Sequence, residues 1–494
     1  MLTFNLTVPV KRFLHGIALS LVAACGSDNV QAPYVESSPT PMPPPDPGNP
    51  TESRDEAERQ LLEDIARQLD ASACNNVTED CAQTIATFRA PPTDTTVSTH
   101  ILVLDWGIHP VALTGYRNRV LATYELSTSL VAEEVFPSQS MASDLDTVFN
   151  LIAEHPYFVS ISAYRTFREH PSRALFDQLT AQTPLYGHGY FITTFLMEYN
   201  PEAQFVLVDL GASDKHLITP EGSCAELLAT DPVANSQALE IIEGAYTSYL
   251  ATIQDLVARH KIDYINASWG SSAIGIAEQI SQVCGDVADR SVVDAIQKID
   301  RDFIRALSQL SYTDQSSQPV STILVQAGAN RAGRDLEIDD PDYLTDCDSH
   351  QLNRVRVQAV ENNGIEPLIP EWGTQAVDAI KPASIAYYKN CTDLFVSLGI
   401  YQDSSLPPGY IYAIRDKGFH AYLHGFVTED FFPGFLSSSF APPVVISALN
   451  FYQQQTTERL SLDELLARLA PNGPIIDPLL YDHFRVYSEG YRAD

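Results

Sequence analysis

The stretch His100-Ile-Leu-Val-Leu-Asp-Trp-Gly107 decides how this sequence is interpreted as a fold. Its apolar residues run without interruption from 101 to 104, which is typical of a strand buried on both faces of a parallel sheet. The aspartate and glycine that follow mark the end of the strand and a turn of the chain. Similar runs occur at 203–210, 261–268, 321–328 and 354–360.

Helical patterns separate these apolar runs, notably at 237–260 and 290–311. Alternation of this kind predicts an α/β fold, with a mostly parallel central sheet and helices on both faces. Ligands of such sheets bind outside the carboxyl ends of the strands. Asp105 and Asn330 each follow a predicted strand, so both are expected at that edge.

Length and charge limit the function classes. The 494 residues are enough for one large domain with attachments. There are 30 basic and 63 acidic residues, a formal net charge of −33. This charge argues against nucleic-acid partners and against electrostatic docking on anionic lipid. We expect a solubilising acidic surface and a monomer.

The first 25 residues predict export and lipid anchoring. Lys11 and Arg12 precede the apolar stretch 13–24, which is too short to span a bilayer as a helix. It ends in Val-Ala-Ala-Cys25, which resembles a bacterial lipobox and implies a signal peptide over 1–24 and a lipid on Cys25. Gly26, rather than an aspartate, favours the outer membrane. The alternative is an ordinary secretory signal with a chance cysteine.

The rest of the chain divides by composition. Residues 25–54 are rich in proline and predict a stiff tether from the membrane. Residues 55–97 begin with an amphipathic pattern, DEAERQLLEDIARQLD, and predict a helical arm. The main domain is expected over 98–475, followed by a tail over 476–494.

Six cysteines remain besides Cys25, and an even count in an exported chain suggests disulfides. Six cysteines allow 15 connectivities. Their spacings do not match a zinc site. Order along the chain favours the pairs Cys74–Cys81, Cys224–Cys284 and Cys347–Cys391.

Two of the candidate functional residues come at strand ends. A carboxylate at Asp105 can accept the Nδ1–H of a histidine, fix its tautomer and stabilise the imidazolium. The amide of Asn330, after the run STILVQAGA, can donate to a developing oxyanion. For each residue taken singly, a role in a turn is the more common explanation.

The histidine candidate is His188, which lies between Gly187 and Gly189 at the start of a helical run. A histidine in that position, without bulky neighbours, is open to both a carboxylate and a serine. His424 and His109 are its competitors. His188 is preferred because a helix and then the strand 203–210 follow it, whereas His424 lies in an aromatic, loop-like stretch.

The nucleophile candidate is Ser439 in SSSFAPPVV, just before a helical run. A helix start supplies free backbone N–H groups and the positive end of the helix dipole, so the Ser439 N–H can help to bind an oxyanion. Ser437 and Ser438 are adjacent competitors. A simple N-cap is the commonest reason for a serine at a helix start.

Taken together and in this order, the segments resemble those of subtilases, the subtilisin-like serine peptidases, over roughly residues 98–475. ILVLDWG resembles the aspartate segment D-[ST]-G, and GHGYFI resembles the H-G-T-H-V helix. KIDYINASWG, ILVQAGAN and SSSFAPPVV resemble the remaining strand, oxyanion and serine segments. Subtilisin carries its triad in the same order along the chain, with aspartate first, then histidine and then serine.

The resemblance implies a subtilisin-like three-layer fold and a serine endopeptidase acting on a peptide or protein substrate. Asp105, His188 and Ser439 would form the triad, with Asn330 as the oxyanion donor. By the same resemblance, Ser268, Trp269 and Gly270 would pair with the substrate backbone beside the S1 pocket.

The sequence also departs from the family pattern. Ser438 replaces the usual threonine, Ser437 the glycine before it, and Trp106 is bulky next to the acid. Two other functions therefore stay open. One is a subtilase-fold surface lipoprotein that binds a partner without cleaving it. The other is an esterase with the same triad, although no G-x-S-x-G motif surrounds Ser439.

The chemistry requires no cofactor. The acidic run 335–348, DLEIDDPDYLTDCD, offers oxygen ligands, and many subtilases bind calcium. It does not match an EF-hand or another defined loop, so a solvated acidic loop is expected there and Ca²⁺ binding stays open.

Overall fold

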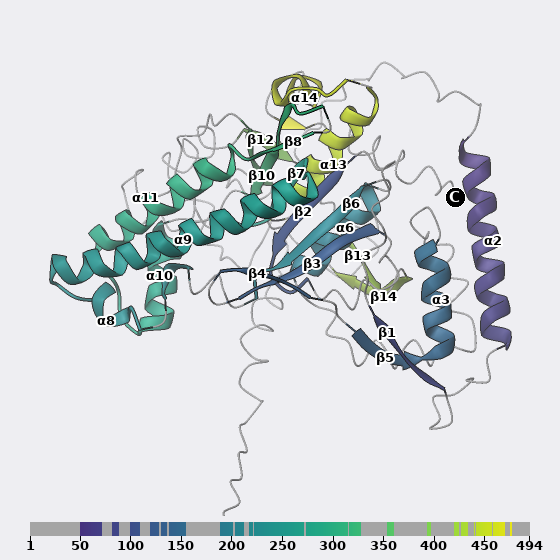
Figure 1. Cartoon of the computed structure of the whole chain (residues 1–494), viewed down its shortest axis with the longest axis horizontal. Helices are drawn as coiled ribbons and strands as arrows, with labels where there is room; N and C mark the ends of the chain where they lie inside the picture. Colours follow the sequence, from purple (N-terminus) through teal and green to yellow (C-terminus); the bar gives the residue numbers. More distant parts are fainter. Residues whose placement is uncertain are drawn as a thin grey trace, which may run out of the picture.

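A central sheet and its helices form the main body of the computed structural model (Figure 1). The structure describes residues 50–71, 82–87, 99–108, 119–127, 130–135, 138–154, 188–200, 203–211, 217–220, 222–270, 273–314, 316–327, 353–359, 393–396, 419–423, 426–432, 439, 441–456, 458–469 and 475–476.

The described strands include a sheet of nine, and the sheet is parallel except at one edge. Its spatial order is β15 (Ile475–Ile476), β12 (Leu394–Val396), β11 (Arg354–Ala359), β10 (Ile323–Ala327), β7 (Tyr264–Ala267), β2 (His100–Asp105), β6 (Gln204–Asp209), β3 (Val120–Leu126) and β4 (Ala132–Glu134). Only the β3–β4 pair is antiparallel. The predicted α/β class with a mostly parallel sheet is confirmed.

Strand β2 lies inside this sheet, between β7 and β6. Its residues 101–105 are fully buried, which explains their unbroken apolar run. All five predicted strands are present as β2, β6, β7, β10 and β11, although β7 is shorter than its apolar run. In the register of β2 and β6, Asp105 lies opposite Asp209, so two carboxylates meet at the carboxyl edge.

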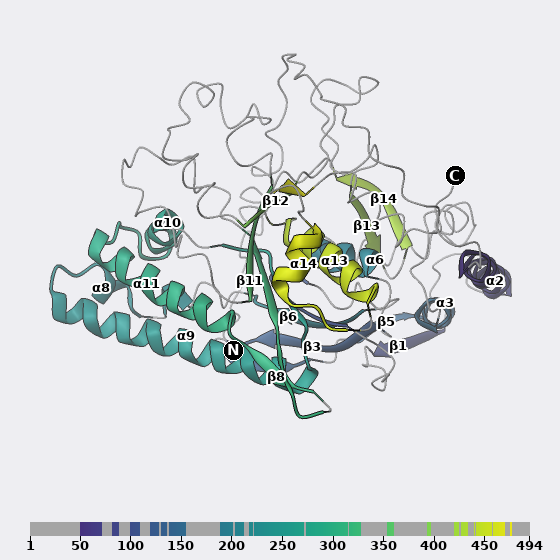
Figure 2. The ribbon, with the colours of Figure 1, turned by 90° about the horizontal axis from the view of Figure 1, so that it is seen from above.

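Helices cover both faces of the sheet (Figure 2). Leu102 and Leu104 belong to a core with helices α9 (Pro232–His260), α10 (Ala273–Cys284) and α11 (Arg290–Leu307). Alternation along the strand directs Asp105 to the opposite face. That face carries α6 (His188–Tyr199) and α13 (Ala441–Gln454), which pack against each other, with α14 (Leu462–Leu469) beside α13.

Two predicted helix bounds and one predicted loop were wrong. Helix α9 begins at Pro232 and not at 237, because Asp231 caps the helix and proline is tolerated in its first turn. Helix α11 ends at Leu307, not 311, because the chain turns at Ser308 and enters a hairpin of β8 (Ser311–Thr313) and β9 (Pro319–Ser321). The aromatic stretch around His424, expected as a loop, contains the hairpin strands β13 (Phe419–Leu423) and β14 (Phe426–Phe432). Paired aromatic residues fit a strand.

The predicted N-terminal helix is present as α2 (Pro50–Ala71), which begins inside the predicted tether. Proline is tolerated in a first helical turn, and this explains the earlier start. Helix α2 packs against α3 (Ser143–Glu154), and β1 (Gln83–Thr87) pairs with β5 (Ser138–Ala142). The N-terminal arm thus packs against the segment of the main domain that contains β5 and α3, at the side of the central sheet (Figure 1).

One predicted disulfide, Cys224–Cys284, is present. It links α8 (Cys224–Leu227) to the end of α10. The cysteines of the other two predicted pairs, and Cys25, lie outside the described residues. No helix in the described ranges has the length and apolar character needed to cross a membrane.

Candidate active site

The carboxylate of Asp105 is fixed by two donors at the carboxyl end of β2. Its Oδ1 accepts the backbone N–H of Trp106 at 2.8 Å. The same oxygen lies 2.7 Å from Nδ1 of His188, which is 83 residues away in the sequence. Because a carboxylate only accepts, Nδ1 carries the proton, and Nε2 of His188 is left as the basic nitrogen.

Glycine at position 189 allows helix α6 to start against the loop after β2. The N–H of Gly189 donates to the carbonyl of Trp106 at 2.7 Å, and the N–H of Tyr190 donates to Gly107 at 3.0 Å. A Cβ on Gly189 would lie 2.9 Å from the Cβ of Asp105 and 3.0 Å from the Trp106 carbonyl oxygen. The missing side chain therefore brings His188 within reach of Asp105.

Asp209 shapes the same loop from the neighbouring strand. Its carboxylate accepts the N–H groups of Gly107 at 3.1 Å, Ile108 at 3.3 Å and Gly211 at 2.9 Å. Gly107 has a φ of 70°, in the left-handed region that favours glycine. The sequence did not single out Asp209, although the signal was present: the runs ending in Leu104-Asp105 and Val208-Asp209 close in the same way.

Opposing forces act on the ionisation of Asp105. Burial raises the pKa of its carboxyl above 3.8, and the nearby charge of Asp209 adds to this rise. The Coulombic attraction and the hydrogen bond of His188 act in the lowering direction, and burial outweighs them. None of the described residues donates to Oδ2. A buried acid with one fixed partner suits the orientation of an imidazole.

Ser439 lies two residues before helix α13 and is buried. The residues of α13 from Ala441 to Asn450 are all buried, because the helix packs on β7, β10, β11 and α6. The helix carrying His188 and the helix following Ser439 are therefore neighbours in one layer.

Buried polar contacts join the C-terminal ends of these two helices. Asn450 Nδ2 donates to Asn200 Oδ1 at 2.9 Å, and Asn200 Nδ2 donates to Ser447 Oγ at 2.9 Å. Thr99, at the amino end of β2, donates to Asn450 Oδ1 at 2.8 Å. Both C-terminal ends are thereby held at the amino edge of the sheet, opposite to Asp105.

Because of this arrangement, the N-termini of α6 and α13 lie at similar distances from the amino edge of the sheet. Asn200 lies 12 residues after His188, and Asn450 lies 11 residues after Ser439. At a rise of about 1.5 Å per residue, the helical part from Ala441 to Asn450 spans roughly 14 Å, and α6 spans roughly 16 Å. With their C-terminal ends joined and both helices packed on the sheet, the two runs lead back toward the carboxyl edge.

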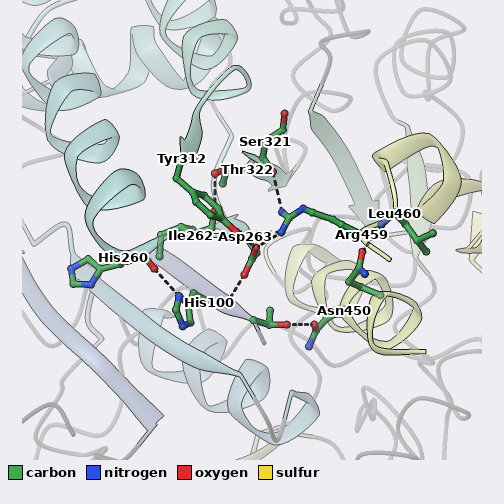
Figure 3. A network of polar contacts seen from close by, with 12 residues as sticks. His100, His260, Ile262, Asp263, Tyr312, Ser321, Thr322, Asn450, Arg459 and Leu460 are labelled. Carbon is green, nitrogen blue, oxygen red and sulfur yellow. Dashed lines mark hydrogen bonds and ion pairs between the residues drawn. The ribbon is translucent and has the colours of Figure 1, made fainter. Parts of the chain in front are cut away.

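A second anchor follows α13 (Figure 3). Asp263, just before β7, accepts Arg459 Nη1 at 2.6 Å, Tyr312 OH at 2.8 Å and the His100 N–H at 2.9 Å. Arg459 Nη2 also donates to the Ser321 carbonyl at 3.1 Å. The segment after α13 is thus tied to the amino edge of the sheet, which limits sliding of the helix. The sequence did not predict this contact set.

The remaining predicted site residues are only partly described. Ser268, Trp269 and Gly270 directly follow β7, which neighbours β2, so they lie at the same edge as Asp105. Ser268 is fully buried, and its Oγ accepts Asn266 Nδ2 at 2.8 Å. Asn330 lies outside the described residues. So do the competitors, His109, His424, Ser437 and Ser438.

The acidic run 335–348 also lies outside the described residues. Among the residues that are described, no group of three or more His, Cys, Asp or Glu could hold a metal ion. A groove of about 600 Å³ between the starts of α9 and α11 is lined by other residues, including Asn235 and Val287, and is separate from this site.

In the described structure, Asp105 contacts His188, and helix α13, which follows Ser439, packs beside helix α6, which begins at His188. Comparisons with protein-family models, with curated proteins and with solved structures found no match to this chain.

Proposed function

We propose that the protein is a serine endopeptidase of divergent subtilase type, with a subtilisin-like fold. The observation that carries the proposal is the 2.7 Å contact of buried Asp105 with His188 at the carboxyl edge of a parallel sheet. A buried carboxylate on Nδ1, which leaves Nε2 as the basic nitrogen, is the arrangement of a general base.

In the proposed reaction, Ser439 Oγ attacks the carbonyl carbon of a peptide bond. His188 Nε2 takes the hydroxyl proton and then gives it to the leaving amine, so an acyl-enzyme forms. Asp105 keeps Nδ1 protonated and stabilises the imidazolium. Asn330 and the Ser439 N–H hold the oxyanion. Water then attacks the acyl group by the same route and releases the acid and the serine.

The site of action follows from the N-terminal sequence. We infer export through the signal 1–24, lipidation of Cys25 and attachment to the outer membrane by the tether. The proposed mechanism requires no metal. Calcium can act only on stability in this scheme, and a calcium-dependent shift of the melting temperature would reveal it.

A fluorophosphonate probe tests the nucleophile. The folded wild type should be labelled at Ser439, and Ser439→Ala and His188→Ala should reduce labelling to background. Ser437→Ala and Ser438→Ala are matched controls that should keep labelling. A folded wild type that is not labelled, or an equal signal from Ser439→Ala, would contradict the assignment and favour a binding protein.

The reaction class needs a second measurement. Labelled denatured casein and a p-nitrophenyl ester should both be hydrolysed, with Ser439 required for both. Ester hydrolysis without peptide cleavage would replace the endopeptidase by an esterase that uses the same residues.

A further inference from the structure

The indole of Trp106 is an exposed aromatic surface at the candidate site. The large apolar side chains that stay exposed in the described part of the chain are Trp106, Val131, Val233, Ile241, Val283 and Val287. Trp106 is the aromatic one among them and is 39% exposed. Exposing an indole is unfavourable by roughly 25 cal/mol per Å² of apolar area, so its position suggests a function.

The backbone of Trp106 is part of the Asp105–His188 pair. Its N–H donates to Asp105 and its carbonyl accepts from Gly189. Its ring stacks on the His188 imidazole, with centroids 4.5 Å apart and an interplanar angle of 14°. The indole is therefore fixed beside the base on one side and open to solvent on the other.

We propose that Trp106 forms the apolar wall of a substrate subsite next to His188. This rests on the proposed function, and it names the substrate class: peptides with an aromatic or branched aliphatic side chain beside the scissile bond. A side chain that packs on the open part of the indole removes apolar area from water.

The charge of the surroundings favours an apolar over an acidic occupant. Asp105 and Asp209 lie at the same edge, and the whole chain carries a net charge of −33. A carboxylate beside His188 would meet like charges, whereas an apolar group would not. A basic side chain is the competing occupant, because ammonium and guanidinium groups also stack on indoles.

Binding can be measured without catalysis. The full-length Ser439→Ala protein carries three tryptophans, so 5-fluorotryptophan gives three resonances that single Trp→Phe variants assign. Blocked tetra-alanine peptides with one position changed to Phe, Leu, Lys, Glu or Gly are the probes. The Trp106 resonance should shift saturably with Phe and Leu, and Kd should be roughly tenfold lower than for the Gly peptide.

Variants of Trp106 decide the assignment. Trp106→Ser should bind the Phe and Gly peptides within about twofold of each other, and Trp106→Phe should restore most of the preference. Val233 is an exposed apolar residue of α9, and Val233→Ser should leave the preference for the Phe peptide over the Gly peptide unchanged. Each variant must unfold cooperatively to show that it is folded. If Trp106→Ser does not fold, the peptide preference of Trp106→Phe is compared with that of the wild-type Trp106 protein instead.

The two proposals fail separately. Serine-dependent cleavage with an unchanged Phe preference in Trp106→Ser, or a preference for Lys, would overturn the subsite and leave the peptidase. Absence of labelling at Ser439 together with Trp106-dependent peptide binding would overturn the peptidase and keep the subsite.

Discussion

The side-chain amide of Asn450 donates to Asn200 at 2.9 Å, although the two residues are 250 positions apart in the sequence. Both are almost completely buried, so each loses its water and depends on the other. This contact fixes the register of α13 against α6. The positions of Ser439 and His188 along the helix axes therefore depend on the Asn200–Asn450 contact at the other end of the two helices.

Replacing Asn450 by alanine should lower both stability and reactivity. The change removes this partner from Asn200 and Thr99 in a buried place, and the free energy of unfolding should fall by about 1–3 kcal/mol. Urea denaturation measures the first effect and the rate of fluorophosphonate labelling measures the second. Gln455→Ala, exposed just after α13, is the control and should change neither. An unaltered labelling rate in a destabilised variant would show that the contact does not align the site.

A methyl group at position 189 should separate His188 from Asp105. In Gly189→Ala the new Cβ would meet Ile108 Cγ1 at 2.7 Å and Asp105 Cβ at 2.9 Å, so α6 must move away from β2. We expect a loss of about 1–3 kcal/mol in unfolding free energy and a strong fall in probe labelling.

Gly244→Ala is the matched control for that change. Gly244 lies within α9, and no heavy atom beyond the adjacent backbone of the helix and the two neighbouring residues lies within 4 Å of its added Cβ. Alanine there should stabilise the protein by about 0.5–1 kcal/mol, because it favours the helix. If Gly189→Ala behaved like Gly244→Ala, the close approach of α6 and β2 would not matter.

The predicted strands came from local signals, whereas pairing Asp105 with His188 came from the order of the segments and their resemblance to subtilases. An unbroken apolar run such as 101–104 indicates burial on both faces of a sheet. The contacts between Asn200 and Asn450 and between Asp263 and Arg459 could not be predicted, because the partners lie 250 and 196 residues apart. Local patterns predict elements, whereas tertiary packing decides which polar residues meet.

The Cys224–Cys284 disulfide should contribute strongly to stability. It closes a loop with a sequence separation of 60 residues, and loop entropy alone gives about 4 kcal/mol. The double serine variant should lose about 2–4 kcal/mol of unfolding free energy. Non-reducing peptide mapping should recover the linked pair. Reductant should destabilise the wild type at least as much as the substitution does, because it also opens the other predicted disulfides.

The raised pKa of Asp105 predicts how stability depends on pH. Burial raises this pKa above 3.8, so the folded state keeps the proton where the unfolded chain has lost it. The resulting stabilisation is fully present below the unfolded pKa and is lost as pH rises through the folded pKa. Asp105→Asn has no such loss. Its unfolding free energy relative to wild type should therefore increase between about pH 3 and about pH 7.

Asp289 supplies a control of opposite sign. It is the N-cap of α11, and the hydrogen bonds of Ser291 to its carboxylate lower its pKa from 3.8. The stabilisation by Asp289 is present above the unfolded pKa and is lost as pH falls through the lowered one. Asp289→Asn should thus lose stability relative to wild type near neutral pH and match it in acid. Chemical denaturation of the three proteins across this range checks both signs. If the stability of Asp105→Asn relative to wild type did not rise between acid and neutral pH, the His188 contact, and not burial, would dominate the ionisation of Asp105.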